Sequence, residues 1–107
     1  MKVQRLKKKK DFTRVLKQGK RVYAETLTIV YLPAEESKMA VCVGKKYGKS
    51  VQRNRIKRLL REAFRVSPPL SAPCHLLLIP KVAEEYSFAA FKRDVSKIFK
   101  REKLVET

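Results

Sequence analysis

Apolar side chains recur along this chain at the spacings of amphipathic helices. Between residues 50 and 66 they stand at i, i+3, i+4, i+7 and i+8, which places them in one stripe. The members of this stripe are Ile56, Leu59, Leu60, Ala63 and Phe64. A second stripe follows Ser87, which suits a helix N-cap, and contains Phe88, Phe91, Val95, Ile98 and Phe99. A shorter helix is predicted from an N-cap at Asp11 to Gly19, with Phe12, Val15 and Leu16 on its apolar face.

Segments rich in β-branched, aromatic or aliphatic residues predict strands at 22–32, 38–44 and 74–79. A turn at 33–37 separates the first two strands. The last segment is nearly all apolar, which is typical of a central strand covered by helices. The order helix, strands, helix, strand, helix predicts an α+β fold, a small α-β sandwich in which helices pack on one sheet.

The charge of the chain indicates that this domain binds a polyanion. Its 107 residues suit one domain, with 44% hydrophobic residues to form a core and a formal net charge of +17. Residues 1–10 are a basic segment that we expect to be a mobile arm. A folded domain this basic repels itself unless polyanions are near. Nucleic acid is the first candidate partner, and an anionic membrane surface is the second.

Residue types that carry catalysis or bind metals are sparse. The two cysteines, Cys42 and Cys74, lie far apart and show no metal-ligand spacing, and the one histidine, His75, lies in a strand that we expect to be buried. We therefore predict a structural role for His75 and no metal site or catalytic residue in the protein. The chain has no apolar run long enough to span a membrane and no signal-peptide pattern, so we expect a reduced, cytoplasmic protein.

The stretch from Gly44 to Ser50 resembles a phosphate-binding loop but departs from it in two ways. Its pattern, G-x-x-x-G-K-S, is one residue shorter than the P-loop pattern. The apolar strand at 74–79 runs into Pro80 and Lys81, so no acidic residue ends it to hold Mg²⁺. We therefore expect no small-molecule nucleotide at this loop.

The loop and the helix after it form a candidate RNA-binding surface. Its residues are Lys45, Lys46, Lys49, Arg53, Asn54, Arg55, Lys57, Arg58, Arg61 and Arg65. Glu62 is the only acid among them, whereas an ordinary solvated helix carries acids at i,i+4 from its basic residues. Arg53 and Arg55 also lie near the helix N-terminus, where the helix dipole disfavours cations and favours anions. An anionic ligand therefore explains these side chains better than helix stability does.

These residues belong to a stretch, KKYGKSVQRNRIKRLLREAFR, that resembles the signature of the bacterial ribonuclease P protein subunit. The resemblance extends to the N-terminal segment from Leu6 through Phe12 to Gly19 and to the last, Phe-rich helix. It implies a left-handed crossover around the motif, a fold like domain 2 of ribosomal protein S5. It also implies that the RNA subunit performs the hydrolysis with Mg²⁺ held largely by RNA, that the protein alone is inactive, and that the protein binds no cofactor itself. The residues that match the motif by position are Arg53, Asn54, Arg55, Lys57 and Arg58.

The resemblance further implies that the single-stranded 5′ leader of precursor tRNA lies in a cleft between the first helix and the sheet. The candidate cleft residues are Phe12, Leu16, Thr28, Val30 and Cys42. Relatives often carry an aromatic residue in place of Leu16, and some carry a tyrosine in place of Val30. From the residues alone, Phe12 fits two roles equally well, stacking on an unpaired base or packing in the core with Val15.

Three functions are compatible with the charge. The first is an RNA-binding subunit of ribonuclease P, with ribonuclease P RNA and precursor tRNA as partners and tRNA 5′ maturation as the activity. The second is a ribosome-associated or general basic RNA-binding protein, which shares the same charge. The third is a standalone nuclease, for which the sequence offers no catalytic residue.

Overall fold

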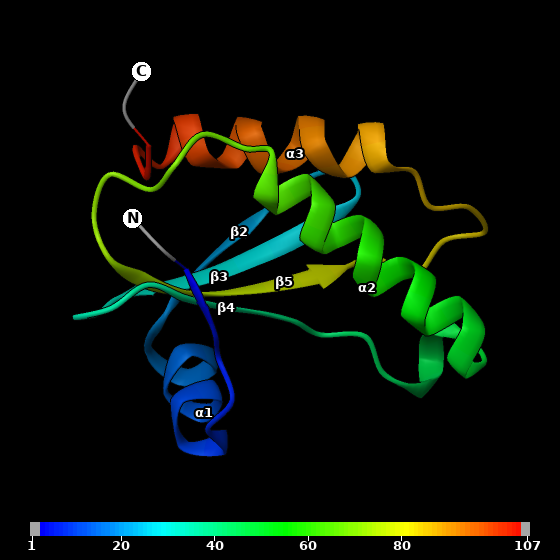
Figure 1. Cartoon of the computed structure of the whole chain (residues 1–107), viewed down its shortest axis with the longest axis horizontal. Helices are drawn as coiled ribbons and strands as arrows, with labels where there is room; N and C mark the ends of the chain where they lie inside the picture. Colours follow the sequence, from blue (N-terminus) through cyan, green and yellow to red (C-terminus); the bar gives the residue numbers. More distant parts are fainter. Residues whose placement is uncertain (1–2, 106–107) are drawn as a thin grey trace.

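The computed structural model describes residues 3–105 as a sheet with helices on both faces (Figure 1). The elements in chain order are β1 (Gln4–Arg5), α1 (Lys9–Gln18), β2 (Lys20–Tyr23), β3 (Leu27–Pro33), β4 (Lys38–Val41), the 3-10 turn η1 (Lys45–Tyr47), α2 (Ser50–Arg65), β5 (Cys74–Pro80) and α3 (Phe88–Arg101). The predicted α+β sandwich is therefore confirmed, and α2 has nearly the predicted bounds.

The sheet has the strand order β1-β4-β5-β3-β2, so β5 is central, as its apolar sequence predicted. β4 runs parallel to β5, and α2 connects the two, whereas β3 runs antiparallel to β5. Figure 1 shows α2 and α3 on one side of the sheet and α1 on the other. The left-handed sense of the β4-α2-β5 connection stays a prediction from the resemblance.

Two apolar clusters hold the layers together, one on each face of the sheet. The larger lies under α2 and α3 and includes Ile56, Leu60, Leu76, Leu78, Ile98 and Phe99. The smaller lies under α1 and includes Leu6, Val15, Val30, Ala40 and Leu77. Side chains along β3 alternate between the two clusters, because Ile29 belongs to the larger cluster and its neighbour Val30 to the smaller. The prediction that Phe88 belongs to the buried stripe of α3 was wrong, because this side chain is 37% exposed.

The predicted strand at 22–32 is in fact a hairpin of β2 and β3. Composition alone favours a strand throughout, but the chain reverses at residues 24–26, and Val22 pairs with Ile29. Asp94 of α3 holds this turn, because its carboxylate accepts hydrogen bonds from the backbone N–H of Thr26, at 2.8 Å, and from the Thr26 hydroxyl. Arg93 adds a contact from its Nε, 3.2 Å from the second carboxylate oxygen. A residue far along the chain therefore fixes where the strand breaks.

Asp94→Asn is expected to lower the free energy of unfolding by about 1–3 kcal/mol at neutral pH, because a charged, buried acceptor of these hydrogen bonds is lost. Burial acts to raise the pKa of Asp94, but the hydrogen bonds from Thr26 and the Arg93 guanidinium outweigh it and hold that pKa below its ordinary value. A lowered folded pKa contributes stability above the ordinary carboxyl value of about 3.9, and this contribution is lost as pH falls through the folded pKa.

Urea unfolding at pH 7 and at pH 3 measures this effect, and the difference between wild type and variant should shrink at pH 3. Glu25→Gln is the matched control, because Glu25 also faces Arg93 but its side chain is exposed. The control should change stability by less than about 0.5 kcal/mol. An equal loss in both variants would contradict the role assigned to Asp94.

The N-terminal segment differs from the predicted arm at residues 1–10. Residues 1 and 2 lie outside the described residues, but β1 pairs in parallel with the start of β4, and Leu6 is buried. The first helix begins at Lys9 rather than after Asp11, and Lys8 is its N-cap. The residues around Leu6 show neither helical nor strand periodicity in their apolar positions. The segment is held only by its pairing with the edge of β4 and by the packing of Leu6 in the smaller cluster.

Gly19 ends α1, as predicted, for a steric reason. A Cβ atom at this position would lie 2.4 Å from the carbonyl oxygen of Val15 and 2.9 Å from that of Tyr31. Only glycine lets the helix end lie this close to β3. This close approach seats α1 on one part of the sheet.

Candidate nucleic-acid interface

The loop before α2 is anchored by an aromatic side chain. Tyr47 is buried in the larger cluster, and its hydroxyl donates a hydrogen bond to the carbonyl oxygen of Pro80. Gly48 has φ +115°, a conformation that residues with side chains rarely adopt, and it lets the chain turn from η1 into α2. Lys46 lies over the Tyr47 ring, 5.4 Å from its centroid. The loop therefore holds its lysines on a fixed base beside the N-terminus of α2.

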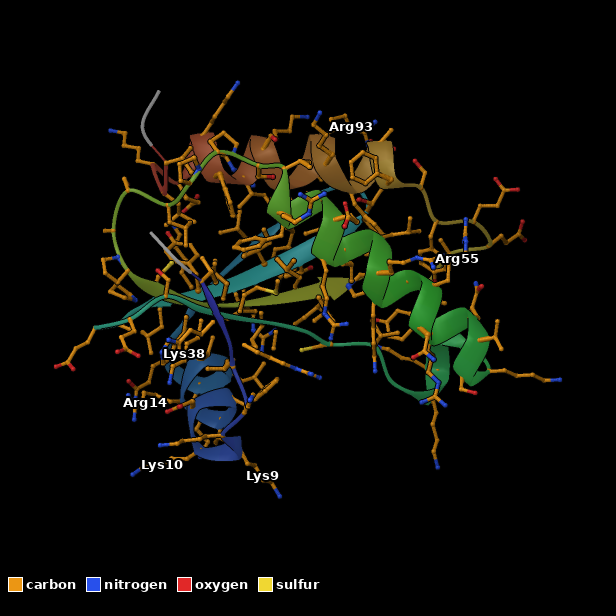
Figure 2. The ribbon with its side chains drawn as sticks, in the orientation of Figure 1. Lys9, Lys10, Arg14, Lys38, Arg55 and Arg93 are labelled. Atoms are coloured by element: carbon orange, nitrogen blue, oxygen red, sulfur yellow. The ribbon has the colours of Figure 1, made fainter. Side chains whose placement is uncertain are left out.

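The ten predicted residues of the loop and α2 form a largely solvent-exposed basic surface. Arg53 and Lys57 are half-buried, and the other eight are exposed. Within residues 3–105, Arg65 is the only basic residue of this set with an ion pair, which it makes to Glu62 at 2.7 Å. Figure 2 shows Arg55 on α2, separated from Lys9, Lys10 and Arg14 on the opposite side of the sheet. Apart from Glu62, no acidic side chain of the described residues therefore forms an ion pair with this surface, as the scarcity of acids in the sequence predicted.

The first turn of α2 is open to an anion. Its N-cap, Lys49, makes no side-chain capping hydrogen bond, and the turn contains no acidic residue. Free N–H groups and the positive end of the helix dipole favour a phosphate at such a position. Arg53 adds a buried Nε that has no hydrogen-bond partner within the described part of the chain. Buried donors are nearly always paired in native proteins, so the unpaired Nε marks Arg53 as a candidate ligand-binding residue.

Apart from Glu62, the acids that form ion pairs within the described residues lie outside α2. Glu102, at the end of α3, accepts hydrogen bonds from Lys20 and from the Tyr31 hydroxyl, each at 2.7 Å. These bonds hold the pKa of Glu102 below its ordinary value, while burial and the carboxylate raise the pKa of Tyr31 to about 12. Glu102 therefore joins two strands to α3, and its charge does not offset that of the α2 surface.

The five predicted cleft residues lie on α1 or on the face of the sheet that α1 covers. Phe12 and Cys42 pack against the smaller cluster, Thr28 is buried on the same face as Val30, with 8% of its surface exposed, and Leu16 is 41% exposed at the helix surface. Val30 itself is fully buried. It supports the cleft from beneath and cannot contact a ligand, which corrects its predicted role. Val30 is buried because Gly19 lets the end of α1 approach β3 closely.

Phe12 serves in part as core, since it packs against the smaller cluster while remaining half-buried. Cys42 is also half-buried, and burial raises the pKa of its thiol. A thiol with a raised pKa is mostly protonated and weakly reactive at neutral pH. These two residues therefore offer a small, apolar surface beside α1.

Tyr23 is a candidate interface residue that the sequence analysis missed. It is 63% exposed and pairs with Thr28 in the antiparallel ladder, so both side chains lie on the α1 face of the sheet. Thr28 in turn pairs with Ile79 at the end of β5. Figure 1 shows α1 beneath the end of the sheet where β5 begins, whereas Tyr23 lies, through its pairing with Thr28, beside the end of β5. The alternation of Arg21, Val22 and Tyr23 indicates that Tyr23 faces away from the buried Val22. The prediction of one long strand over these residues obscured this pattern.

His75 is buried, and burial lowers its pKa. Within residues 3–105, no three His, Cys, Asp or Glu side chains gather in a way that could hold a metal ion. None of the helices described between residues 3 and 105 is long and apolar enough to cross a membrane.

The small sheet and the helix whose arginines mostly lack acidic partners define a class of protein, a basic α+β domain with a surface suited to a polyanion. Comparison with known proteins gives this class a family. The Ribonuclease P family model matches residues 1–103. The chain belongs to the ribonuclease P protein family.

Individual relatives agree with this assignment. The ribonuclease P protein component of Dictyoglomus turgidum is 42% identical over 86 residues, which cover 78% of this chain and 72% of that protein. The component from Coprothermobacter proteolyticus is 39% identical over 77 residues, covering 72% of this chain and 65% of that protein. The structure of the Staphylococcus aureus RNase P protein superposes with a TM-score of 0.82 at 26% identity, covering 98% of this chain and all of that one.

Proposed function

We propose that this protein is the RNA-binding subunit of a ribonuclease P ribonucleoprotein and assists removal of the 5′ leader from precursor tRNA. The observation that carries the proposal is the surface from Lys45 to Arg58, on which no basic residue has an acidic partner within the described residues. Such a surface binds the RNA subunit through its phosphates, with arginines forming paired hydrogen bonds to them. Membership of the ribonuclease P protein family supports ribonuclease P RNA as the RNA bound.

In this proposal the two faces of the sheet have different RNA partners. The loop and the N-terminal part of α2, from Lys45 to Arg58, bind ribonuclease P RNA, and the α1 face, with Phe12, Tyr23 and Cys42, holds the single-stranded leader. An exposed aromatic ring such as Tyr23 stacks on unpaired bases without requiring a particular sequence. The RNA subunit carries out the hydrolysis with Mg²⁺ that it holds, and the protein alone is inactive. The complex acts in the cytoplasm.

Reconstitution with a bacterial ribonuclease P RNA tests this function. At low Mg²⁺ and low salt, the folded protein should restore 5′ cleavage of precursor tRNA that the RNA alone performs poorly. Its affinity for the RNA should fall linearly on a plot of log affinity against log salt concentration, because bound phosphates release counterions. Failure to stimulate cleavage, with folded protein and intact RNA, would contradict the proposal.

Competition separates this function from general RNA binding. Precursor tRNA with its leader should displace labelled precursor from the reconstituted complex better than mature tRNA does. A general basic RNA-binding protein would show equal competition by the two RNAs, because the phosphate charge is nearly the same. Cleavage by the purified protein without RNA would instead support a standalone nuclease.

A further inference from the structure

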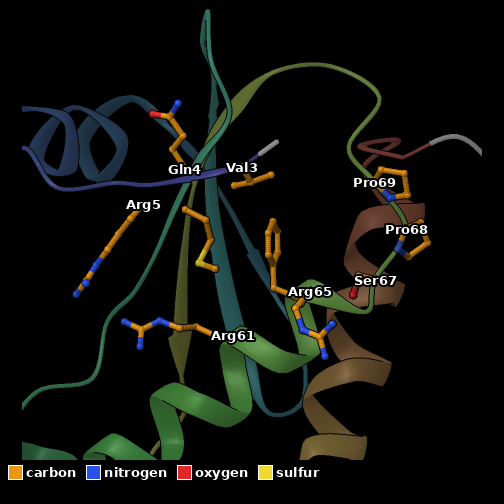
Figure 3. Close-up of a pocket in the computed structure, with 10 residues that line it drawn as sticks. Val3, Gln4, Arg5, Arg61, Arg65, Ser67, Pro68 and Pro69 are labelled. Carbon is orange, nitrogen blue, oxygen red and sulfur yellow. The ribbon is translucent and has the colours of Figure 1, made fainter. Parts of the chain in front are cut away.

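A hollow of about 720 Å³ opens between β1, β4 and the C-terminal half of α2 (Figure 3). Its lining combines the apolar side chains of Met39 and Phe64 with the guanidinium groups of Arg5, Arg61 and Arg65. The hollow is large enough for a nucleotide, since small-molecule sites commonly enclose about 300–1,000 Å³. It lies on the α2 side of the sheet, apart from the cleft residues beside α1.

The charges around this hollow favour an anionic occupant. Neither Arg5 nor Arg61 makes an ion pair or a side-chain hydrogen bond to another residue between 3 and 105, while Arg65 is bound to Glu62. Figure 3 shows Arg5 of β1 and Arg61 of α2 on one side of the hollow and Arg65 across from them. An apolar peptide would leave these guanidinium groups without partners. A nucleotide satisfies both parts of the lining, with its base on the apolar side chains and its phosphates on the arginines.

A second hollow connects this one to the other face of the sheet. It encloses about 340 Å³, shares Arg5, Met39 and Arg61 with the first, and reaches Phe12 and Ala40. The passage exists because β1 covers only the first two residues of β4. Beyond Met39, no strand within the described residues lies along the outer edge of β4. The groove therefore runs from the α1 side, around the edge of the sheet, to Phe64.

We propose that the first hollow is a binding site for an unpaired nucleotide of the precursor tRNA leader, whose base packs on Met39 and Phe64 and whose phosphate is bound by Arg5 and Arg61. This inference rests on the proposed function and extends it, because it carries the leader beyond Phe12 and around the edge of the sheet. The leader is the occupant because the groove is continuous with the α1 side, where the leader lies in the proposed function.

Photocrosslinking on the reconstituted, unmodified complex tests the site directly. The probes are precursor tRNAs with a single 4-thiouridine placed at successive leader positions, and crosslinked peptides are identified by mass spectrometry. One leader position should crosslink to Met39 or Phe64, and a position nearer the cleavage site should crosslink to Phe12. Leader crosslinks confined to the α1 face, or crosslinks from 4-thiouridine in the RNA subunit to Met39 or Phe64, would overturn the proposal.

Leader length provides an independent measurement. Arg5→Ala should weaken binding of precursor tRNA with a long leader by roughly tenfold or more, since a charged hydrogen bond to phosphate is lost. Binding of precursor with a leader too short to pass Phe12 should be unchanged. Lys97→Ala, which removes the same charge from an exposed position on α3, is the matched control and should show no dependence on leader length. Equal weakening for all leaders in Arg5→Ala would refute the site and leave the proposed function intact, whereas failure of the wild-type protein to stimulate cleavage would refute both.

Discussion

The double variant Arg53→Ala with Arg55→Ala should bind ribonuclease P RNA at least about a hundredfold more weakly while remaining as stable as the wild-type protein. Each arginine replaced removes charge-assisted hydrogen bonds to phosphate worth roughly 1.5–3 kcal/mol. Stability should hold because Arg55 is exposed and makes no ion pair within the described residues, and because cations near a helix N-terminus are unfavourable. Replacing Arg53 should not lower stability either, because its buried Nε has no hydrogen-bond partner among the described residues. Removing an unsatisfied donor removes an unfavourable term from the free energy of folding.

Filter binding across a salt series, together with thermal unfolding, measures both halves of this prediction. The salt slope should decrease by about two, as two phosphate contacts are lost. Lys92→Ala with Lys97→Ala is the control, because it removes the same charge from exposed positions on α3. Equal weakening in the control would mean that net charge alone binds the RNA. A fall of several degrees in melting temperature would mean that the arginines are structural.

Leu60→Ala should lower the free energy of unfolding by about 2–5 kcal/mol, because a buried leucine is replaced by a cavity. Leu60 is fully buried in the larger cluster, in the contact of α2 with the sheet and α3. A loss of this size is a large part of the total stability of a domain of this length, which is commonly 5–15 kcal/mol. Urea unfolding monitored by circular dichroism gives the value.

Val51→Ala is the matched control for Leu60→Ala, because it lies in the same helix but is 82% exposed. Alanine has the higher helix propensity, so this control should be neutral or slightly stabilising. The Leu60→Ala protein should still bind RNA at temperatures where it is folded, because no basic residue is changed. A loss below about 1 kcal/mol would show that the apolar stripe is not the main contact of α2.

The α2 surface could be predicted from sequence because one local rule decides both the helix and its faces. The period of Ile56, Leu60 and Ala63 gives the buried side, and Arg55, Arg58 and Arg61 then point elsewhere. No distant contact is needed to place them. Helical periodicity wrongly predicted that Phe88 is buried. This residue is the first of α3, and few neighbours cover it there.

The cleft and the groove depend on strand pairing, and here the sequence was a weaker guide. The alternation of a strand puts Thr28 and Val30 on one face, but it cannot show that α1 covers Val30 and leaves Tyr23 exposed. The turn between β2 and β3 is held by Asp94, a residue that no local pattern links to it. Arg5 likewise reaches Arg61 only because β1 pairs with β4.

By itself, the sequence determined the class of fold, the span and faces of α2, the central place of β5 and the basic character of the surface. Each of these follows from periodicity, apolar content or charge, which are properties of neighbouring residues along the chain. The tertiary structure alone decided the β2-β3 hairpin, the pairing of the N-terminal segment with β4, the exposure of Tyr23 and the hollow beside Phe64. These features arise from contacts between segments distant in sequence, where the free energy of packing outweighs local preference.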